Sequence, residues 1–185
     1  MHLCVMEMKT CLKYLCVLLV LLAGCERDDI CAEETPTTPQ LILRFYSLAD
    51  PDTIDPVPDL YAYGLDDDDN PVEFLGVIAS TKDSIAIPLR TNVDQTRFVL
   101  HQNFDIDDNG TPGDPTDDIV LGNPDIVTLN YLHEDVHVSR ACGFKTIFNS
   151  IAFSVDIDGD NWIINSDILE ENVENEFQAH VKVLH

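Results

Sequence analysis

Short hydrophobic runs separated by polar turn residues dominate the chain after residue 40. The runs are rich in Val, Ile, Leu, Phe and Tyr, and clusters of Asp, Asn, Pro and Gly lie between them, which is the pattern of β-strands joined by turns. Residues 181–183 alternate apolar and polar, as a half-buried strand does. No long segment has the 3.6-residue period of an amphipathic helix. The expected strand segments are 41–48, 60–65, 74–79, 84–89, 96–104, 126–132, 136–138, 146–155, 162–169 and 177–184.

About eight strands at this spacing predict an all-β domain, an antiparallel immunoglobulin-like β-sandwich. The stretch 105–123 is expected to be the longest loop.

The N-terminal segment differs from the rest and indicates export. Lys9 and Lys13 precede an uncharged apolar run, 14–22, which is too short to span a bilayer as a helix. The run ends in Leu-Ala-Gly-Cys at 22–25, which resembles the lipobox of bacterial lipoproteins. We therefore expect residues 1–24 to be a cleaved signal peptide and Cys25 to carry the lipid. Residues 25–39 would form a lipidated tether and 40–185 a single domain.

The net charge of the chain limits the classes of partner that it can bind. Its 10 Lys and Arg against 34 Asp and Glu give a formal net charge of −24. Such a charge repels phosphates and argues against nucleic-acid binding and against adsorption on an anionic membrane surface. Membrane affinity would come from the lipid, and a protein or glycan partner is expected. The acids could serve solubility or bind divalent cations; solubility is the favoured interpretation.

Cysteine usage fits an oxidising compartment. Once the signal peptide is removed and Cys25 is acylated, Cys31 and Cys142 remain. A disulfide between them would close a loop of roughly 110 residues and contribute on the order of 4 kcal/mol. Two free thiols are the alternative, and the even count favours the bridge.

A zinc-protease motif lies at 133–137. His133-Glu134-Asp-Val-His137 matches HExxH, in which a helix places both imidazoles on one zinc ion and the glutamate activates a water. The flanking residues favour a strand, in which residues four apart lie about 13 Å from each other and cannot share an ion. A zinc-dependent hydrolase is therefore the alternative function, and exposed hairpin histidines are the favoured interpretation.

Two acidic loops could bind calcium. Asp105, Asp107 and Asn109, followed by Gly110, resemble the first half of an EF-hand loop, although the glutamate at position 12 is missing. A second Asp-x-Asp-x-Asp cluster lies at 156–160. Ordinary acidic turns explain both, because turns prefer Asp, Asn and Gly. A bound Ca²⁺ would make the chain a calcium-stabilised, adhesin-like module.

Three segments resemble an uncharacterised family of Bacteroidota lipoproteins. They are the Cys-x5-Cys start at 25–31, Thr-Pro-Gln-Leu-Ile-Leu-Arg-Phe-Tyr at 38–46, and Val-Ser-Arg-Ala-Cys-Gly-Phe-Lys-Thr-Ile-Phe at 138–148. The resemblance implies a small β-rich lipoprotein with its two remaining cysteines paired, and it implies no activity. Glu-Arg-Asp-Asp at 26–29 is similar to the signal that sends such lipoproteins to the outer face of the outer membrane; a solvated acidic linker is the alternative.

These observations favour a non-enzymatic, lipid-anchored module of the outer membrane, exposed at the cell surface, that binds a partner or supports a larger complex. Substrate and partner are not encoded in any motif.

Overall fold

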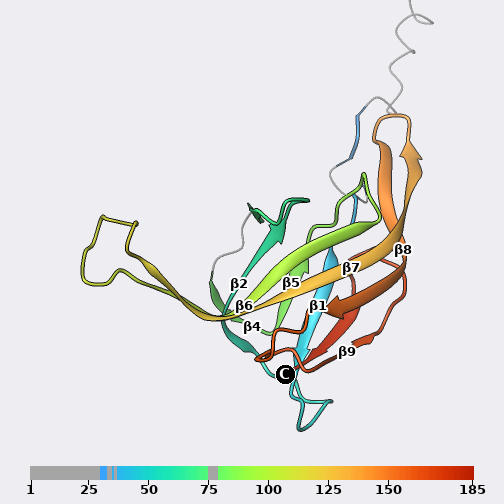
Figure 1. Cartoon of the computed structure of the whole chain (residues 1–185). Coiled ribbons are helices and arrows are strands. Elements are labelled where there is room, and N and C mark those ends of the chain that lie inside the picture. Colours follow the sequence, from blue (N-terminus) through green and yellow to red (C-terminus); the bar gives the residue numbers. More distant parts are fainter. Residues whose placement is uncertain (1–29, 33–34, 36, 75–78) are drawn as a thin grey trace, which may run out of the picture. The chain divides into compact units, whose positions relative to one another are not determined.

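The computed structural model describes residues 30–32, 35, 37–74 and 79–185, and within them the chain is all β (Figure 1). The signal segment and Cys25 lie outside the described residues. No helix in these ranges is long and apolar enough to cross a membrane. The chain divides into two units: residues 36–136 with 145–185 form the sandwich, and residues 1–35 with 137–144 form a smaller unit. The sequence placed the domain boundary at 40 and did not separate 137–144.

One sheet of the sandwich has four strands in the order β5-β1-β10-β9. β1 lies inside this sheet and pairs with β5 in antiparallel and with β10 in parallel orientation. The first strand of the domain therefore contacts the last one directly. The strands are β1 (Leu41–Tyr46), β5 (Ser84–Ile87), β9 (Asn165–Ile168) and β10 (Val181–Leu184).

The second sheet has the order β3-β2-β6-β7-β8, and β4 also pairs with β2. Its described pairings are antiparallel. Its strands are β2 (Val57–Leu65), β3 (Pro71–Glu73), β4 (Ser80–Lys82), β6 (Gln95–Asp107), β7 (Ile119–Ser139) and β8 (Gly143–Val155).

The hydrophobic core fills the space between the sheets. β1 follows a strict alternation in which every second residue is buried, and β10 follows it over its first three residues, because successive side chains of a strand point to opposite faces. The large, fully buried side chains include Phe45 of β1, Phe98 of β6 and Phe148 of β8. The predicted sandwich is confirmed, with the parallel β1–β10 pair as its departure from antiparallel order.

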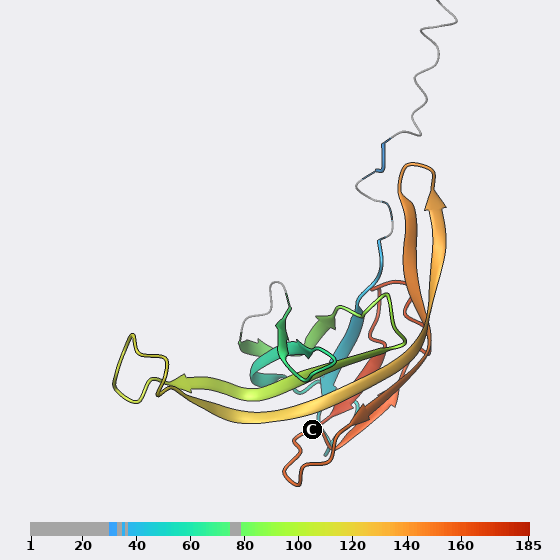
Figure 2. The ribbon, with the colours of Figure 1, turned by 45° about the horizontal axis from the view of Figure 1, so that its top comes forward.

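The prediction that residues 105–123 form a loop is wrong in part. β6 and β7 stay paired beyond the sandwich, from Asp105 opposite Leu121 to Asp107 opposite Ile119. They form an arm, residues 105–121, that projects from the sandwich and ends in the turn 108–118 (Figures 1 and 2). Apolar side chains at 106 and 119–121 are exposed on the arm. Backbone pairing therefore continues where the side chains gain no burial.

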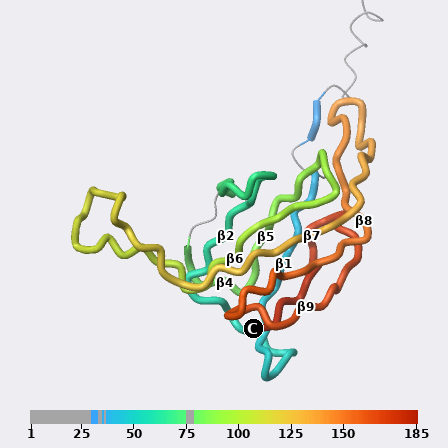
Figure 3. The backbone as a smooth tube through the Cα atoms, in the orientation of Figure 1, coloured from blue at the N-terminus to red at the C-terminus, as the bar shows by residue number. Residues whose placement is uncertain are grey.

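β7 is a single strand of 21 residues, although the sequence predicted two strands, 126–132 and 136–138. The polar residues 133–135 are exposed, so they do not interrupt the strand. Figure 3 follows this strand from the arm through the sandwich sheet. The run 162–169 was also expected to be a strand throughout, and the structure limits the strand to Asn165–Ile168.

Candidate binding site

The predicted disulfide is present. Cys31 and Cys142 are bridged within the smaller unit, with their Cα atoms 4.9 Å apart. Ser139 Oγ accepts a hydrogen bond from the Cys142 amide at 3.1 Å and thereby shapes the turn that holds the cysteine. The bridge links the tether to the β7–β8 hairpin, as the residue count suggested.

The HExxH residues do not form a zinc centre. His133, Glu134 and His137 lie in β7 and not in a helix, so the local geometry that the motif requires is missing. His133 Nδ1 lies 2.7 Å from an oxygen of Asp94, and His137 packs edge-on against Phe144. Among the described residues, no three His, Cys, Asp or Glu side chains gather as a metal would need. The zinc-hydrolase alternative therefore loses its structural basis.

The calcium residues are used as turn formers. Asp105 and Asp107 close the outer end of β6, and Asn109 lies in the turn with a φ of 51°. Asp107 Oδ1 accepts the Asn109 amide at 2.9 Å, and Asp105 Oδ1 accepts the Ile106 amide at 2.9 Å. Such Asx contacts are the ordinary role of Asp in turns. Calcium binding at this loop stays a prediction, and it would require these side chains to reorient.

The other acidic runs have similar local roles. In the second cluster, Asn161 closes the turn by donating to the Asp156 carbonyl at 2.8 Å. In the run 66–69, Asp66 accepts the amides of Asp68 and Asn70. In all three acidic runs, Asp or Asn side chains therefore bond the backbone of their own turns.

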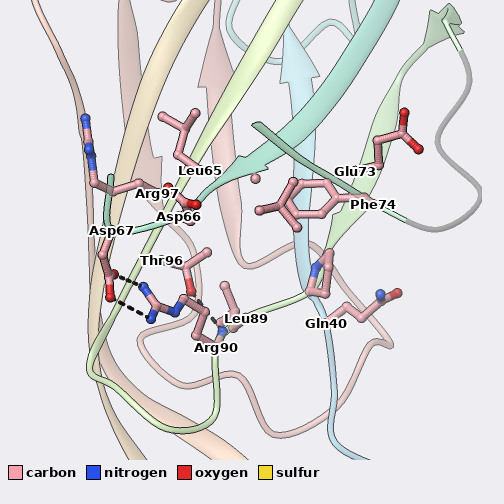
Figure 4. A pocket seen from close by; sticks show the side chains of 13 residues that line it. Gln40, Leu65, Asp66, Asp67, Glu73, Phe74, Leu89, Arg90, Thr96 and Arg97 are labelled. Atoms are coloured by element: carbon pink, nitrogen blue, oxygen red, sulfur yellow. Dashed lines mark hydrogen bonds and ion pairs between the residues drawn. The ribbon is translucent and has the colours of Figure 1, made fainter. Parts of the chain in front are cut away.

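A pocket of about 520 Å³ opens beside the β2–β3 hairpin (Figure 4). We call it the hairpin pocket. Its floor is apolar, with Leu65, Phe74 and Leu89 among the lining side chains, and its rim carries charged groups. The complete lining is Gln40, Gly64, Leu65, Asp66, Asp67, Val72, Glu73, Phe74, Pro88, Leu89, Arg90, Thr96 and Arg97.

The cations of the hairpin pocket are already paired. Arg90 Nη1 lies 2.6 Å from Asp67 Oδ1, and this hydrogen bond lowers the pKa of Asp67. Arg97 pairs with Asp69. Both carboxylates belong to the β2–β3 turn, so the two ion pairs hold one wall of the pocket and leave no free cation there for an anionic ligand.

A second depression, of about 530 Å³, lies on the outer face of the β3-β2-β6-β7-β8 sheet, which is the face opposite the core. We call it the aromatic trough. Tyr61 and Tyr63 alternate with the core residues Leu60 and Ala62 along β2, so both rings lie on the outer face. Its lining residues are Tyr61, Tyr63, Pro71, Glu73, His101, Phe104, Val120, Gly122 and Pro124.

The rings of the trough pack against one another. The ring centroids of Tyr61 and Phe104 are 4.6 Å apart, and those of Tyr61 and Tyr63 are 5.7 Å apart. His101, which lies opposite Tyr61 in the β2–β6 pairing, packs edge-on against Phe104 at 5.0 Å. These contacts lie in the range favoured by aromatic pairs.

A β-bulge brings Phe104 into the trough. The β6–β7 register shifts between Gln102 and Asp105, so two residues of β6, Asn103 and Phe104, lie opposite the single residue Gly122. The extra residue returns Phe104 to the face that carries His101. Gly122 has a φ of +106°, and a Cβ there would lie 2.5 Å from the Gln102 carbonyl oxygen. Only glycine fits this position.

The two ionisable groups of the trough that are not phenols, His101 and Glu73, differ in exposure. The His101 side chain is only 5% exposed, and its Nε2 makes no hydrogen bond of ordinary geometry, although the carbonyls of Leu121 and Gly122 lie near the ring. Burial lowers the pKa of His101, so the imidazole is neutral near pH 7. Glu73, on the rim, forms no ion pair with any described residue.

Asp125 is a buried carboxylate that sequence reasoning did not identify. Its Oδ2 accepts the Ile163 amide at 2.8 Å, and burial raises its pKa. It joins β7 to the segment that follows the 156–160 turn and supports the core. One acid among 34 carries no local signal for such a role.

The trough was also missed from the sequence. Tyr61 and Phe104 are 43 positions apart, and they meet only through the β2–β6 register and the bulge. The one usable signal was Gly122 within a β-like run, because an isolated glycine in a strand often marks a bulge.

Comparison with known proteins identifies a family and no activity. No curated protein and no solved structure matches the chain. Residues 61–185 match the model of a family of unknown function, DUF6452, which covers both recesses apart from Gln40. The chain therefore belongs to this family of unknown function, DUF6452.

Proposed function

We propose that the protein is an exported lipoprotein, anchored by a lipid on Cys25 to the outer membrane and exposed at the cell surface, that binds a ligand without catalysing a reaction. The observation that carries the proposal is the Cys31–Cys142 disulfide. Stable disulfides form in oxidising compartments, and a chain with this bridge is built to leave the cytoplasm. The lipobox-like 22–25 segment and the basic and apolar residues before it support the anchor.

The binding role is supported by the aromatic trough. In the hairpin pocket, the charged groups of Arg90 and Arg97 are paired within the protein. In the trough, the aromatic side chains are partly exposed, and Glu73 lies on the rim without an ion pair to any described residue. Small-molecule sites are mostly apolar depressions with a few polar groups at their edges, and the trough has this form, which favours a binding role.

Metabolic labelling with an alkyne-palmitate analogue tests the anchor. The expected result is a labelled chain in the outer-membrane fraction, and the variant Cys25→Ser is expected to be unlabelled and released from that fraction. Cys31→Ser is the matched control, because it replaces the other cysteine of the same tether, breaks the bridge to Cys142 and keeps the lipidation site. A wild-type chain that stays unlabelled, or a Cys25→Ser chain that stays fully membrane-bound, would reject lipid anchoring.

Surface exposure needs a separate measurement. Intact cells treated with a membrane-impermeant amine-reactive biotin should label the protein at its lysines, whereas a periplasmic protein should label only after the outer membrane is opened. Labelling restricted to opened cells would move the protein to the periplasmic face.

A further inference from the structure

The turn at the end of the arm contains the only Asn-Gly pair of the sequence, Asn109-Gly110. Both residues are exposed, and the turn 108–118 closes the arm at its outer end, away from the sandwich (Figure 2). The side-chain amide of Asn109 makes no hydrogen bond with any described residue. Water and base can therefore reach both residues, and no hydrogen bond restrains the Asn109 side chain.

An asparagine side chain can react with the backbone of the residue that follows it. A base removes the proton of the following backbone amide, and the nitrogen attacks the side-chain carbonyl carbon of the asparagine. The C–N bond of the side-chain amide then breaks, and ammonia leaves. Water opens the resulting five-membered imide at either carbonyl and gives aspartate or isoaspartate. The net reaction consumes one water, releases one ammonia and needs no oxidant or cofactor.

Gly110 leaves the attacking nitrogen open. A side chain on the residue after asparagine would shield this nitrogen, and glycine has none. A Cβ built at Gly110 would meet no atom within 4 Å, so the space around it is free as well. The Gly110 amide donates to Asp108 Oδ1 at 3.0 Å, and this hydrogen bond lies wholly within the exposed turn. It can open without any movement of the sandwich.

The pair Asn149-Ser150 in β8 offers a contrast within the same chain. Asn149 is partly buried, and its Nδ2 donates to Glu134 Oε2 at 3.3 Å. The Ser150 amide donates to Asn172 Oδ1 at 3.2 Å, so both reacting groups are held by side chains of other segments. Asn149 should therefore react much more slowly than Asn109 while the protein is folded.

We propose that Asn109 deamidates spontaneously in the folded protein, so that the arm ends in a mixture of asparagine, aspartate and isoaspartate forms. Each product adds one negative charge to the turn. The isoaspartate form also routes the backbone through the former side chain and lengthens it by one carbon atom. The turn bonds from Asn109 to Asp107 and from Gly110 to Asp108 then lose their spacing. The chemical structure of the arm tip thus changes with the age of the molecule.

Peptide mapping by mass spectrometry on the mature lipoprotein tests the proposal. The purified protein is incubated at mildly acidic and at mildly alkaline pH and is then digested with pepsin in acid, where imide formation is slow. We expect residue 109 to gain the mass of an amide-to-carboxyl exchange in two chromatographic forms, one of them a substrate for isoaspartyl methyltransferase. Conversion should be faster at alkaline pH, because base removes the amide proton. Asn149 is the internal control and should be at least tenfold less converted.

Two variants test the role of each residue of the pair. Gly110→Ala should slow the conversion of Asn109 at least fivefold, because its methyl group shields the amide nitrogen, and Asn109→Gln should abolish the new forms. Both changes lie outside the core, and thermal melts check that the sandwich is intact. Conversion of Asn109 no faster than that of Asn149, an equal rate at both pH values, or an unchanged rate in Gly110→Ala would each overturn the inference.

Discussion

Removal of the Cys31–Cys142 disulfide should destabilise the protein by less than the length of its loop suggests. The bridge joins residues 111 positions apart. In the chain-entropy model, closing a loop of this length in the unfolded chain corresponds to about 5 kcal/mol. That figure applies when the folded state holds the two sulfurs together without help from the bridge.

The structure predicts a smaller loss of stability when the bridge is removed. Thr38 Oγ1 accepts a hydrogen bond from the Thr146 amide at 3.0 Å, so the sandwich itself brings the end of the tether to β8. From this junction, seven residues lead back to Cys31 and four lead back to Cys142. The folded protein without the bridge therefore has an open loop of about 11 residues. The difference between loops of 111 and about 11 residues is about 2 kcal/mol of loop-closure free energy.

Urea unfolding of the double variant Cys31→Ser/Cys142→Ser against wild type measures this free energy. We expect a loss of about 2 kcal/mol, and a lower Tm by about 4–8 °C for a chain of this size. The double variant leaves no unpaired thiol at either position. A loss of 4 kcal/mol or more would show that the folded protein holds the two cysteines together even without the bridge. No loss would show that the Thr38–Thr146 junction does not restrain the tether when the bridge is absent.

Three further substitutions probe the fold. Asp125→Asn should raise the free energy of unfolding at neutral pH by about 1–2 kcal/mol. Burial raises the pKa of Asp125 in the folded protein, so its ionisation destabilises the protein as the pH increases above 3.8, the pKa in the unfolded chain. The gain should shrink in unfolding measured towards pH 3.8, and a pH-independent gain would contradict the charge argument. His180 accepts the Ile42 amide at Nδ1, and burial lowers its pKa, so stability should fall as pH drops below 6.5; His180→Gln should flatten that slope in the same titration. Gly122→Ala should cost about 2–4 kcal/mol in thermal unfolding, through its positive φ and the 2.5 Å approach to Gln102, and a neutral effect would show that the bulge can relax.

The fold class could be predicted because each strand carries its pattern locally. The alternation in β1 and β10 and the Asp, Asn and Gly turns between strands are visible without tertiary information. The extent of β6 and β7 could not be predicted. Their outer parts, 105–107 and 119–121, have a mixed pattern, and pairing rather than burial keeps them extended.

The candidate site was less accessible to sequence reasoning. HExxH and the Asp-rich loops are contiguous motifs, so they were found, but the strand and turn conformations give those residues other roles. The trough is assembled from β2, β3, β6 and β7 and depends on a bulge at Gly122. A site defined by cross-strand register leaves no contiguous motif, and aromatic residues at 61, 63 and 104 look the same in sequence whether they enter the core or the surface.

The parallel β1–β10 pair has a mechanical consequence. β1 is the first strand after the tether, and it is hydrogen-bonded on both sides, to β5 and to β10. A force that pulls on an anchored N-terminus acts along β1, so the ladders to both neighbours are loaded in shear and their bonds must break together. The bridge from Cys31 to Cys142 diverts part of that force into the β7–β8 hairpin before it reaches β1. If the proposed lipid holds the N-terminus, tension on it would be shared between the two sheets.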